Sequence, residues 1–331
     1  MGKIDIVIPW VDGSDPEWQK LRQQYAGEED FGNNDQRFRD WDLLKYWFRG
    51  VEKNAPWVNR IHFITCGHLP AWLNTNHPKL HVVNHKDYIP EEYLPTFSSN
   101  PIELNIHRID ELSEKFIYFN DDLYIIGKVS PKDFFYRDIP KSAAGLAVSG
   151  QTGPEFESIL LADSDLINRH FISRDVLRRH FFKFFHRKYG IKQNLKTLLL
   201  LPYCWYYFPG FYNAHTPNAY LKSTFAEVWG KASHKLSDTC SHKFRTPCDV
   251  NQYVFLWWQW CKGLVVPQNV RKLFTYLSVF CSDEQISDVI KNKKTPMIAV
   301  NDDWCENFEQ KKVMLKDAFD TILGEKSSFE L

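Results

Sequence analysis

Short apolar runs alternate with longer amphipathic segments through about the first 130 residues. Runs rich in β-branched and aromatic residues predict strands at residues 4–8, 60–65, 80–83, 115–119 and 123–126. Apolar residues spaced three or four apart predict amphipathic helices at residues 35–53 and 101–113. Such alternation is typical of a parallel or mixed sheet flanked by helices, which binds ligands beyond the carboxyl ends of its strands.

The second half of the chain has a mostly helical pattern. The clearest helices are predicted at residues 158–185 and 250–261, followed by a last strand at 297–300 and a charged C-terminal helix. No internal repeat is present. We therefore expect one α/β domain with a mostly helical insertion.

Two adjacent carboxylates interrupt the apolar segment KFIYFNDDLYIIG, residues 115–127. Asp121 and Asp122 at the end of a buried strand repel each other and resist desolvation, so a cation or a proton should compensate them. Mg²⁺ takes one or two carboxylates and shares phosphate oxygens with a substrate. With Asn120, the pair predicts a site for Mg²⁺ or Mn²⁺ and a diphosphate; the alternative is a loop-capping role.

Four further polar clusters support a site. They are DGSD at 12–15, HTP at 215–217, Arg245 with Asp249 ahead of a Trp-rich helix, and a second NDD at 301–303. On the predicted helix 101–113, Glu103, His107 and Asp110 are expected on one face. Each cluster alone could be a turn, a helix cap or a surface pair.

Composition narrows the partners and the compartment. Lys plus Arg and Asp plus Glu both number 41, so no overall field recruits nucleic acid, and an anionic ligand needs a local cluster. The seven scattered cysteines fit reduced thiols. Because the N-terminus leads directly into a predicted strand without a secretory signal, we expect a cytoplasmic protein.

The segment 178–207 combines basic residues with aromatics and leucines. It fits a helix pair packed on the core with a solvated basic edge. It also fits a patch that contacts the inner face of the cell membrane peripherally, or a groove for an anionic or lipid-linked acceptor. The sequence leaves both interpretations open.

Taken together, these motifs resemble the Stealth family of sugar-phosphate transferases, which includes bacterial capsule polymerases and the lysosomal-enzyme N-acetylglucosamine-1-phosphotransferase. Four stretches carry the resemblance: IDIVIPWVDGSDPEW; RFRDWDLLKYWFRGVEKNAPWVNRIHFIT with NPIELNIHRIDELSEKFIYFNDDLYI; NAHTPNAYLKSTFAEVW; and AVNDDW. Two positions depart from the family pattern, with His68 where Gln is usual and Trp47-Phe48 where Ser-Leu is usual. These departures bear on substrate choice more than on chemistry.

The resemblance implies a Rossmann-like, glycosyltransferase-A-like fold in a single catalytic domain, residues 1–331. Within it we expect a nucleotide-sugar-binding α/β part at 1–134, a helical insertion at 135–212, and a C-terminal part at 213–331 that completes the active site.

The residues and the resemblance together assign the site. Catalytic roles are expected for Glu103, Asp122, His215 and Arg245. Substrate binding is expected for Trp10, Asp12, Gly13, Arg39, Arg108, Asn120 and Asp249, and metal ligation for Asp121, Asp122 and Asp302. Arg245 suits a phosphoryl group, and His215 suits proton transfer or phosphate binding.

The expected reaction moves a sugar-1-phosphate from a nucleotide-diphosphate sugar, by resemblance a UDP-sugar, to a hydroxyl of an oligosaccharide or lipid-linked glycan. Nucleoside monophosphate would leave. The alternative is a metal-dependent glycosyltransferase that releases nucleoside diphosphate. A non-catalytic glycan-binding module would account for the twelve tryptophans but not for the acidic pair beside His215 and Arg245.

Overall fold

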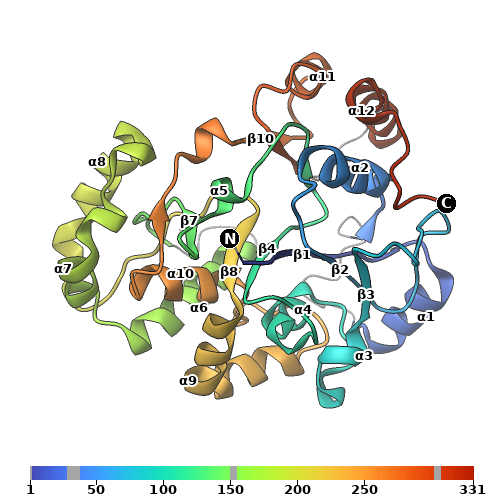
Figure 1. Cartoon of the computed structure of the whole chain (residues 1–331). Coiled ribbons are helices and arrows are strands. Elements are labelled where there is room, and N and C mark those ends of the chain that lie inside the picture. The colour runs from blue at the N-terminus through green and yellow to red at the C-terminus, as the bar shows by residue number, and fades with distance from the viewer. Residues whose placement is uncertain (1, 28–37, 150–154, 302–306) are drawn as a thin grey trace.

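Five strands form the main sheet, in the order β3-β2-β1-β4-β8 (Figure 1). The computed structural model describes residues 2–27, 38–149, 155–301 and 307–331. The strands are β1 (Ile4–Pro9), β2 (Ile61–Thr65), β3 (Leu80–Asn84), β4 (Lys115–Tyr118) and β8 (Asn218–Leu221). The first four are parallel and β8 is antiparallel to β4. This order matches a doubly wound sheet and confirms the expected α/β, Rossmann-like fold.

Two smaller sheets adjoin it. One has the order β10-β11-β5, with β10 (Phe274–Ser278), β11 (Met297–Asn301) and β5 (Leu123–Ile125); the other has the order β6-β7-β9, with β6 (Phe135–Tyr136), β7 (Ile139–Ser142) and β9 (Val266–Pro267). The turn after β4 therefore leads from the main sheet into β5, which pairs antiparallel with β11.

Helices cover both faces of the main sheet. The α-helices are α1 (Pro16–Tyr25), α2 (Leu44–Asn54), α3 (His85–Tyr88), α4 (Ser99–Leu104), α5 (Pro131–Phe134), α6 (Glu155–His170), α7 (Ser173–Phe184), α8 (Gly190–Leu200), α9 (Lys222–Ser241), α10 (Tyr253–Cys261), α11 (Asp283–Lys291) and α12 (Phe308–Leu323). Short 3-10 turns lie at Glu91–Tyr93, Ile106–Arg108, Arg187–Tyr189, Leu201–Tyr203 and Val270–Lys272.

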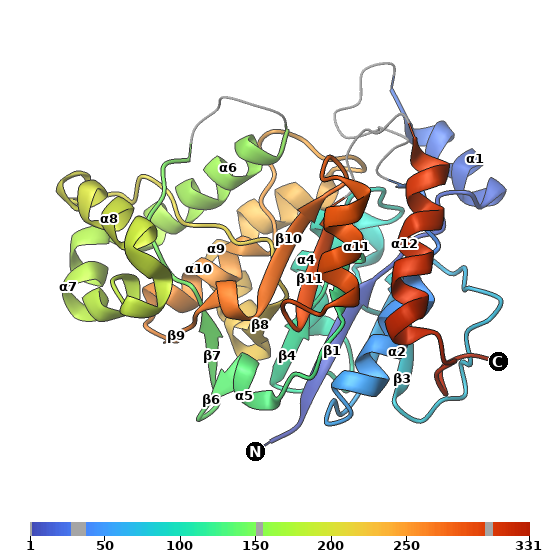
Figure 2. The ribbon, with the colours of Figure 1, turned by 90° about the horizontal axis from the view of Figure 1, so that it is seen from above.

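The alternation of side chains along β1 separates two hydrophobic cores. Ile4, Ile6 and Ile8 pack in a core with α2, α11 and α12, which lie on one side of the main sheet (Figures 1 and 2). Val7 points to the opposite core, which contains α4 and helices α6 to α10. The helices of the middle segment thus share one core with α9 and α10.

Two predicted helices are shorter in the structure. Within the described residues, the helix expected over 35–53 begins at Leu44, because Asp42 adopts a positive φ of 55° and its N–H donates to the side chain of Asp40. The helix expected over 101–113 ends at Leu104, where the side-chain amide of Asn105 donates a hydrogen bond to the carbonyl of Pro101 at 2.8 Å. A side chain that bonds the carbonyl four residues back competes with the helix.

Candidate active site

A cavity of about 270 Å³ lies at the carboxyl ends of β1 and β4. The predicted site residues that line it are Trp10, Glu103, Asn120, Asp121, His215 and Arg245. They come from the loops after β1 and β4, from α4, from the loop before β8 and from the segment before α10. This is the edge at which parallel sheets bind ligands.

His215 on the cavity wall is paired with Asp122 behind it. The Nε2 atom of the ring lies 2.8 Å from Oδ2 of Asp122. Burial alone would lower the pKa of His215, but the hydrogen bond and the negative charge of Asp122 outweigh it and raise that pKa. Within the described residues Nδ1 has no hydrogen-bond partner, so the pair orients the ring with Nδ1 available.

A backbone hydrogen bond from β11 fixes the acidic turn that carries Asp122. The Asp122 carbonyl accepts a hydrogen bond from Val300 N at 2.9 Å, which joins the turn to β11. The second carboxylate oxygen, Oδ1, is buried and has no hydrogen-bond partner in the described part of the chain. A buried carboxylate oxygen without a partner is costly, so this position can accept a cation or a proton.

Glu103 links three elements beside the cavity. Its side chain is buried, with Oε1 accepting from Tyr118 Oη at 3.0 Å and Oε2 from Gln252 N at 3.3 Å. Burial raises the pKa of Glu103, against the lowering effect of the Arg245 charge. The carboxyl thus connects α4 and β4 with the start of α10.

Arg245 is held by a hydroxyl and by an aromatic cluster. Its Nη2 donates to Ser99 Oγ at 2.7 Å. The preceding residue, Phe244, stacks on Phe97 with ring centroids 5.2 Å apart, and Phe97 contacts Trp18 of α1. The planar guanidinium group therefore has a fixed position on the cavity wall, where its fork suits a phosphate.

Asp249 does not line the cavity. It is 1% exposed, and its two oxygens pair with Nδ1 of His242 at 2.7 Å, the amide and hydroxyl of Thr246 at 2.9 and 2.8 Å, and the Asn100 amide at 3.2 Å. The structure therefore does not place Asp249 where it would touch a substrate in this cavity. Asp249 instead fixes the loop that carries Arg245.

Asp12 and Gly13 lie in the same loop as Trp10 but not on the cavity wall. The backbone N–H of Asp12 donates to His68 Nε2 at 2.7 Å, which joins the loops after β1 and β2. A Cβ on Gly13 would lie 1.8 Å from the carbonyl oxygen of Phe38, so only glycine fits there.

Three further predicted residues lie elsewhere. Arg39 lies over the ring of Phe308 at 4.5 Å, and Arg108 lies over Trp229 at 4.8 Å, so the structure does not bring either guanidinium group to the cavity. Asp302 falls outside the described residues. His107, expected on the same helix face as Glu103, lies beyond the end of α4, packs against Trp229 and does not line the cavity.

The sequence analysis missed several neutral polar residues of the cavity wall. They are Ser99, Asn100, Asn251 and Gln252. A signal existed for the first two, because Ser98 caps α4 by accepting from Asn100 N at 3.2 Å, and a Ser-rich helix start can be read from SSNP. Neutral amides elsewhere in a loop carry no comparable signal.

Known proteins that are similar to this chain match it along nearly its whole length. The chain is 40% identical to the capsular polysaccharide phosphotransferase WcwK of Streptococcus pneumoniae, over 100% of this chain and 98% of the relative. It is 39% identical to the receptor polysaccharide phosphotransferase WefC of Streptococcus gordonii, over 99% of each, and 37% identical to the exopolysaccharide phosphotransferase cps2G of Lactiplantibacillus plantarum, over 99% and 96%.

Solved structures with a similar fold are more distant. The galactosyltransferase LgtC is 12% identical with a TM-score of 0.39, covering 95% of each chain. Mouse xyloside xylosyltransferase 1 is 12% identical with a TM-score of 0.36, covering 91% of this chain and 98% of that one. Likenesses at this level are too weak to support a functional argument.

Two family models match the N-terminal part of the chain. Residues 2–30 match conserved region 1 of the Stealth proteins, and residues 37–142 match conserved region 2. The third and fourth regions, around His215 and Asn301, stay predictions. With the two matched regions and relatives near 40% identity along its full length, the chain belongs to the Stealth family.

Proposed function

We propose that this protein transfers a sugar-1-phosphate from a nucleotide-diphosphate sugar, by family resemblance a UDP-hexose or UDP-N-acetylhexosamine, to a hydroxyl of a glycan acceptor. The acceptor oxygen attacks the phosphorus that bears the sugar. The bond from that phosphorus to the oxygen bridging the two phosphates breaks, and nucleoside monophosphate leaves. The product is a phosphodiester in capsule or another cell-surface polysaccharide.

One observation carries this proposal: Arg245 and His215, whose ring is held from behind by Asp122, line one cavity at the carboxyl edge of the sheet. A guanidinium group and an imidazole are the groups that phosphoryl transfer needs for charge stabilisation and proton transfer. The relatives at 37–40% identity also bear the name phosphotransferase.

The side chains divide the chemistry between them. The Nδ1 atom of His215 takes the proton of the acceptor hydroxyl, while Asp122 orients the ring from its far side. Arg245 stabilises charge on the transferring phosphoryl group. Glu103 keeps Arg245 and the start of α10 in place. A second candidate role for its carboxyl group is to bind a hydroxyl of the sugar.

The acidic turn fits a hard divalent cation. Asp122 offers a buried oxygen without a partner in the described residues, and Asp121 beside it lines the cavity. In the described part of the chain, no three His, Cys, Asp or Glu side chains converge as a ready cage. Mg²⁺ needs only one or two carboxylates and completes its shell with water and phosphate oxygens. Asp121 and Asp122 would hold Mg²⁺ or Mn²⁺, which would neutralise the diphosphate.

The decisive experiment identifies the bond that breaks. Purified protein is incubated with candidate nucleotide sugars and a glycan acceptor, and the released nucleotide and the phosphorus NMR spectrum of the product are recorded. We expect nucleoside monophosphate in equal amount to a new phosphodiester. Release of nucleoside diphosphate with a phosphorus-free glycoside would replace this proposal with an ordinary glycosyl transfer, in which the acceptor attacks the sugar carbon.

A further inference from the structure

Helix α8 is turned with its polar side toward the protein. Gln193 and Thr197 are buried, and the Gln193 amide donates to the carbonyl of Leu146 at 2.9 Å. On the outside, Ile191 is 87% exposed, Leu195 54% and Leu199 65%. A surface helix of a soluble protein normally has the opposite arrangement.

Neighbouring side chains extend this exposed apolar surface. Together they form what we call the α7–α8 patch: Ile172, Phe182, Ile191, Leu195, Leu198, Leu199, Tyr203, Trp205, Tyr206 and Tyr207. Helices α7 and α8 lie at the outer edge of the molecule in both views, with no other element beyond them (Figures 1 and 2). Large apolar side chains gathered in this number on one edge of a molecule mark an interaction site.

The charge around the patch is predominantly positive, with Asp175 of α7, 3.6 Å from Arg174, as the one acidic residue in the sequence from 172 to 207. No Asp or Glu occurs between residues 176 and 226, whereas 178–207 contains seven Lys or Arg residues. The exposed ones are Arg178, Arg179, Arg187, Lys188, Lys192 and Lys196. In a chain with a formal net charge of zero, this is a local positive field.

We propose that the α7–α8 patch docks on the surface of a membrane rich in anionic lipids. Leucines and aromatics enter the boundary between headgroups and acyl chains, and the basic side chains meet the lipid phosphates. A second copy of this chain would bring two positive patches together, so like-charge repulsion disfavours self-association. No helix in the described residues is long and apolar enough to cross a bilayer, so the contact is peripheral.

Vesicle flotation tests this directly, using the full chain without any substrate. We expect binding to vesicles that contain phosphatidylglycerol, little binding to phosphatidylcholine alone, and loss of binding as salt rises from about 0.1 M to about 0.5 M. Because no turnover is measured, the result stands apart from the transfer reaction.

Two pairs of substitutions locate the surface. Lys192→Ala with Lys196→Ala should weaken binding about 25-fold, at roughly fivefold for each basic residue near an anionic surface. Leu195→Gln with Leu199→Gln should weaken it at every salt concentration at which the unmodified protein binds. The matched controls are Lys20→Ala with Lys291→Ala, and Val313→Gln with Phe280→Gln, which change exposed residues outside the patch. Equal melting temperatures verify folding.

Three results would overturn the proposal. These are absence of binding to anionic vesicles, equal weakening by patch and control variants, and a dimer in sedimentation that Leu195→Gln with Leu199→Gln dissociates. The last result would assign the patch to a second copy of the chain.

Discussion

The two oxygens of the Asp122 carboxylate have different surroundings. Oδ2 pairs with His215, whereas Oδ1 is buried and without a partner in the described residues. The backbone of Asp122 is fixed through Val300. One side chain can therefore orient the imidazole and bind a cation, and its charge matters for both.

Asp122→Asn should reduce the transfer rate far more than it reduces stability. Losing one major electrostatic group at a phosphoryl centre costs about 10²- to 10³-fold in rate. The melting temperature should hardly change, because the amide keeps the size of the carboxylate. Steady-state rates and calorimetric Mn²⁺ binding measure the two roles, and the exposed Asp110→Asn is the matched control.

The outcomes separate the roles of Asp122. Weakened Mn²⁺ binding supports ligation, whereas normal Mn²⁺ binding with a lost rate leaves only the orientation of His215. Turnover should also stop in excess chelator and return with Mg²⁺. A variant that unfolds while keeping its activity per folded molecule would make Asp122 a structural residue.

At the scale of elements, the start of α10 depends on a buried acid in α6. Asp163 is fully buried, and its Oδ1 accepts from Asn251 N at 2.9 Å. Burial raises the pKa of Asp163 well above its usual value, and the negative charges of Glu103 and Asp249 add to this effect. The folded protein therefore favours the neutral acid at this position.

Asp163→Asn should stabilise the protein increasingly as pH rises. The unfolded chain loses the proton near pH 3.8, and the folded chain keeps it to higher pH, so the wild type loses about 1.4 kcal/mol per pH unit between the two pKa values. Melting temperatures from about pH 5 to about pH 7 should diverge in favour of the variant. Asp165→Asn, on the exposed side of α6, should show no such trend. A deficit for Asp163→Asn that is constant with pH would contradict this prediction.

The sequence predicts elements better than their ends. The six predicted strands follow from apolar runs and agree with β1 to β5 and β11 within about two residues, whereas β6 to β10 were not predicted. Helix ends depend on local hydrogen bonds such as that of Asn105 to Pro101. The helix expected over 158–185 is likewise two helices, α6 and α7, with a break at Phe171 and Ile172. Side-chain bonds that stop a helix do not alter its apolar periodicity.

Site residues can be predicted from the sequence where charged side chains interrupt an apolar run. Asp121 met that condition, whereas His215 and Arg245 lie in polar segments and were assigned with the help of the family resemblance. All three line the cavity, and their chemical roles stay predictions. Arg39 and Arg108 have the same charge as Arg245 but lie over aromatic rings. Only the packing of distant segments distinguishes these guanidinium groups, and the sequence pattern does not contain that information.

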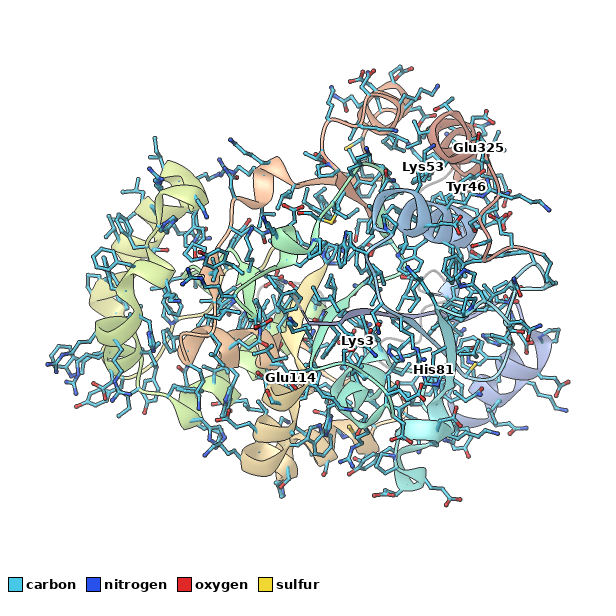
Figure 3. All side chains as sticks on the ribbon, viewed as in Figure 1. Lys3, Tyr46, Lys53, His81, Glu114 and Glu325 are labelled. Carbon is cyan, nitrogen blue, oxygen red and sulfur yellow. The ribbon has the colours of Figure 1, made fainter. Side chains whose placement is uncertain are left out.

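At the scale of the whole molecule, the C-terminal segment closes the core beneath α2. Tyr46 of α2, labelled in Figure 3, stacks on Phe319 of α12 with centroids 5.3 Å apart. The Nε and Nη2 atoms of Arg49 each donate to Glu330 at 2.7 Å, and Arg49 also bonds the carbonyl of Leu323. Helix α2 is thus joined to the C-terminal segment by a buried, bidentate ion pair.

Glu330→Ala should destabilise the fold without changing the activity of the folded fraction. It leaves the Arg49 charge buried and unpaired, which costs about 3–5 kcal/mol. Burial alone would raise the pKa of Glu330, but the hydrogen bonds from Arg49 and Ser327 lower it. The stabilisation is therefore complete above the unfolded pKa of 4.5 and is lost as pH falls through the lower folded pKa.

Urea unfolding at neutral and acidic pH measures the difference in unfolding free energy between the wild type and Glu330→Ala. This gap should shrink in acid. The exposed Glu325→Ala (Figure 3) is the matched control and should have little effect. A gap as large in acid as at neutral pH would assign the loss to packing instead of to the ion pair.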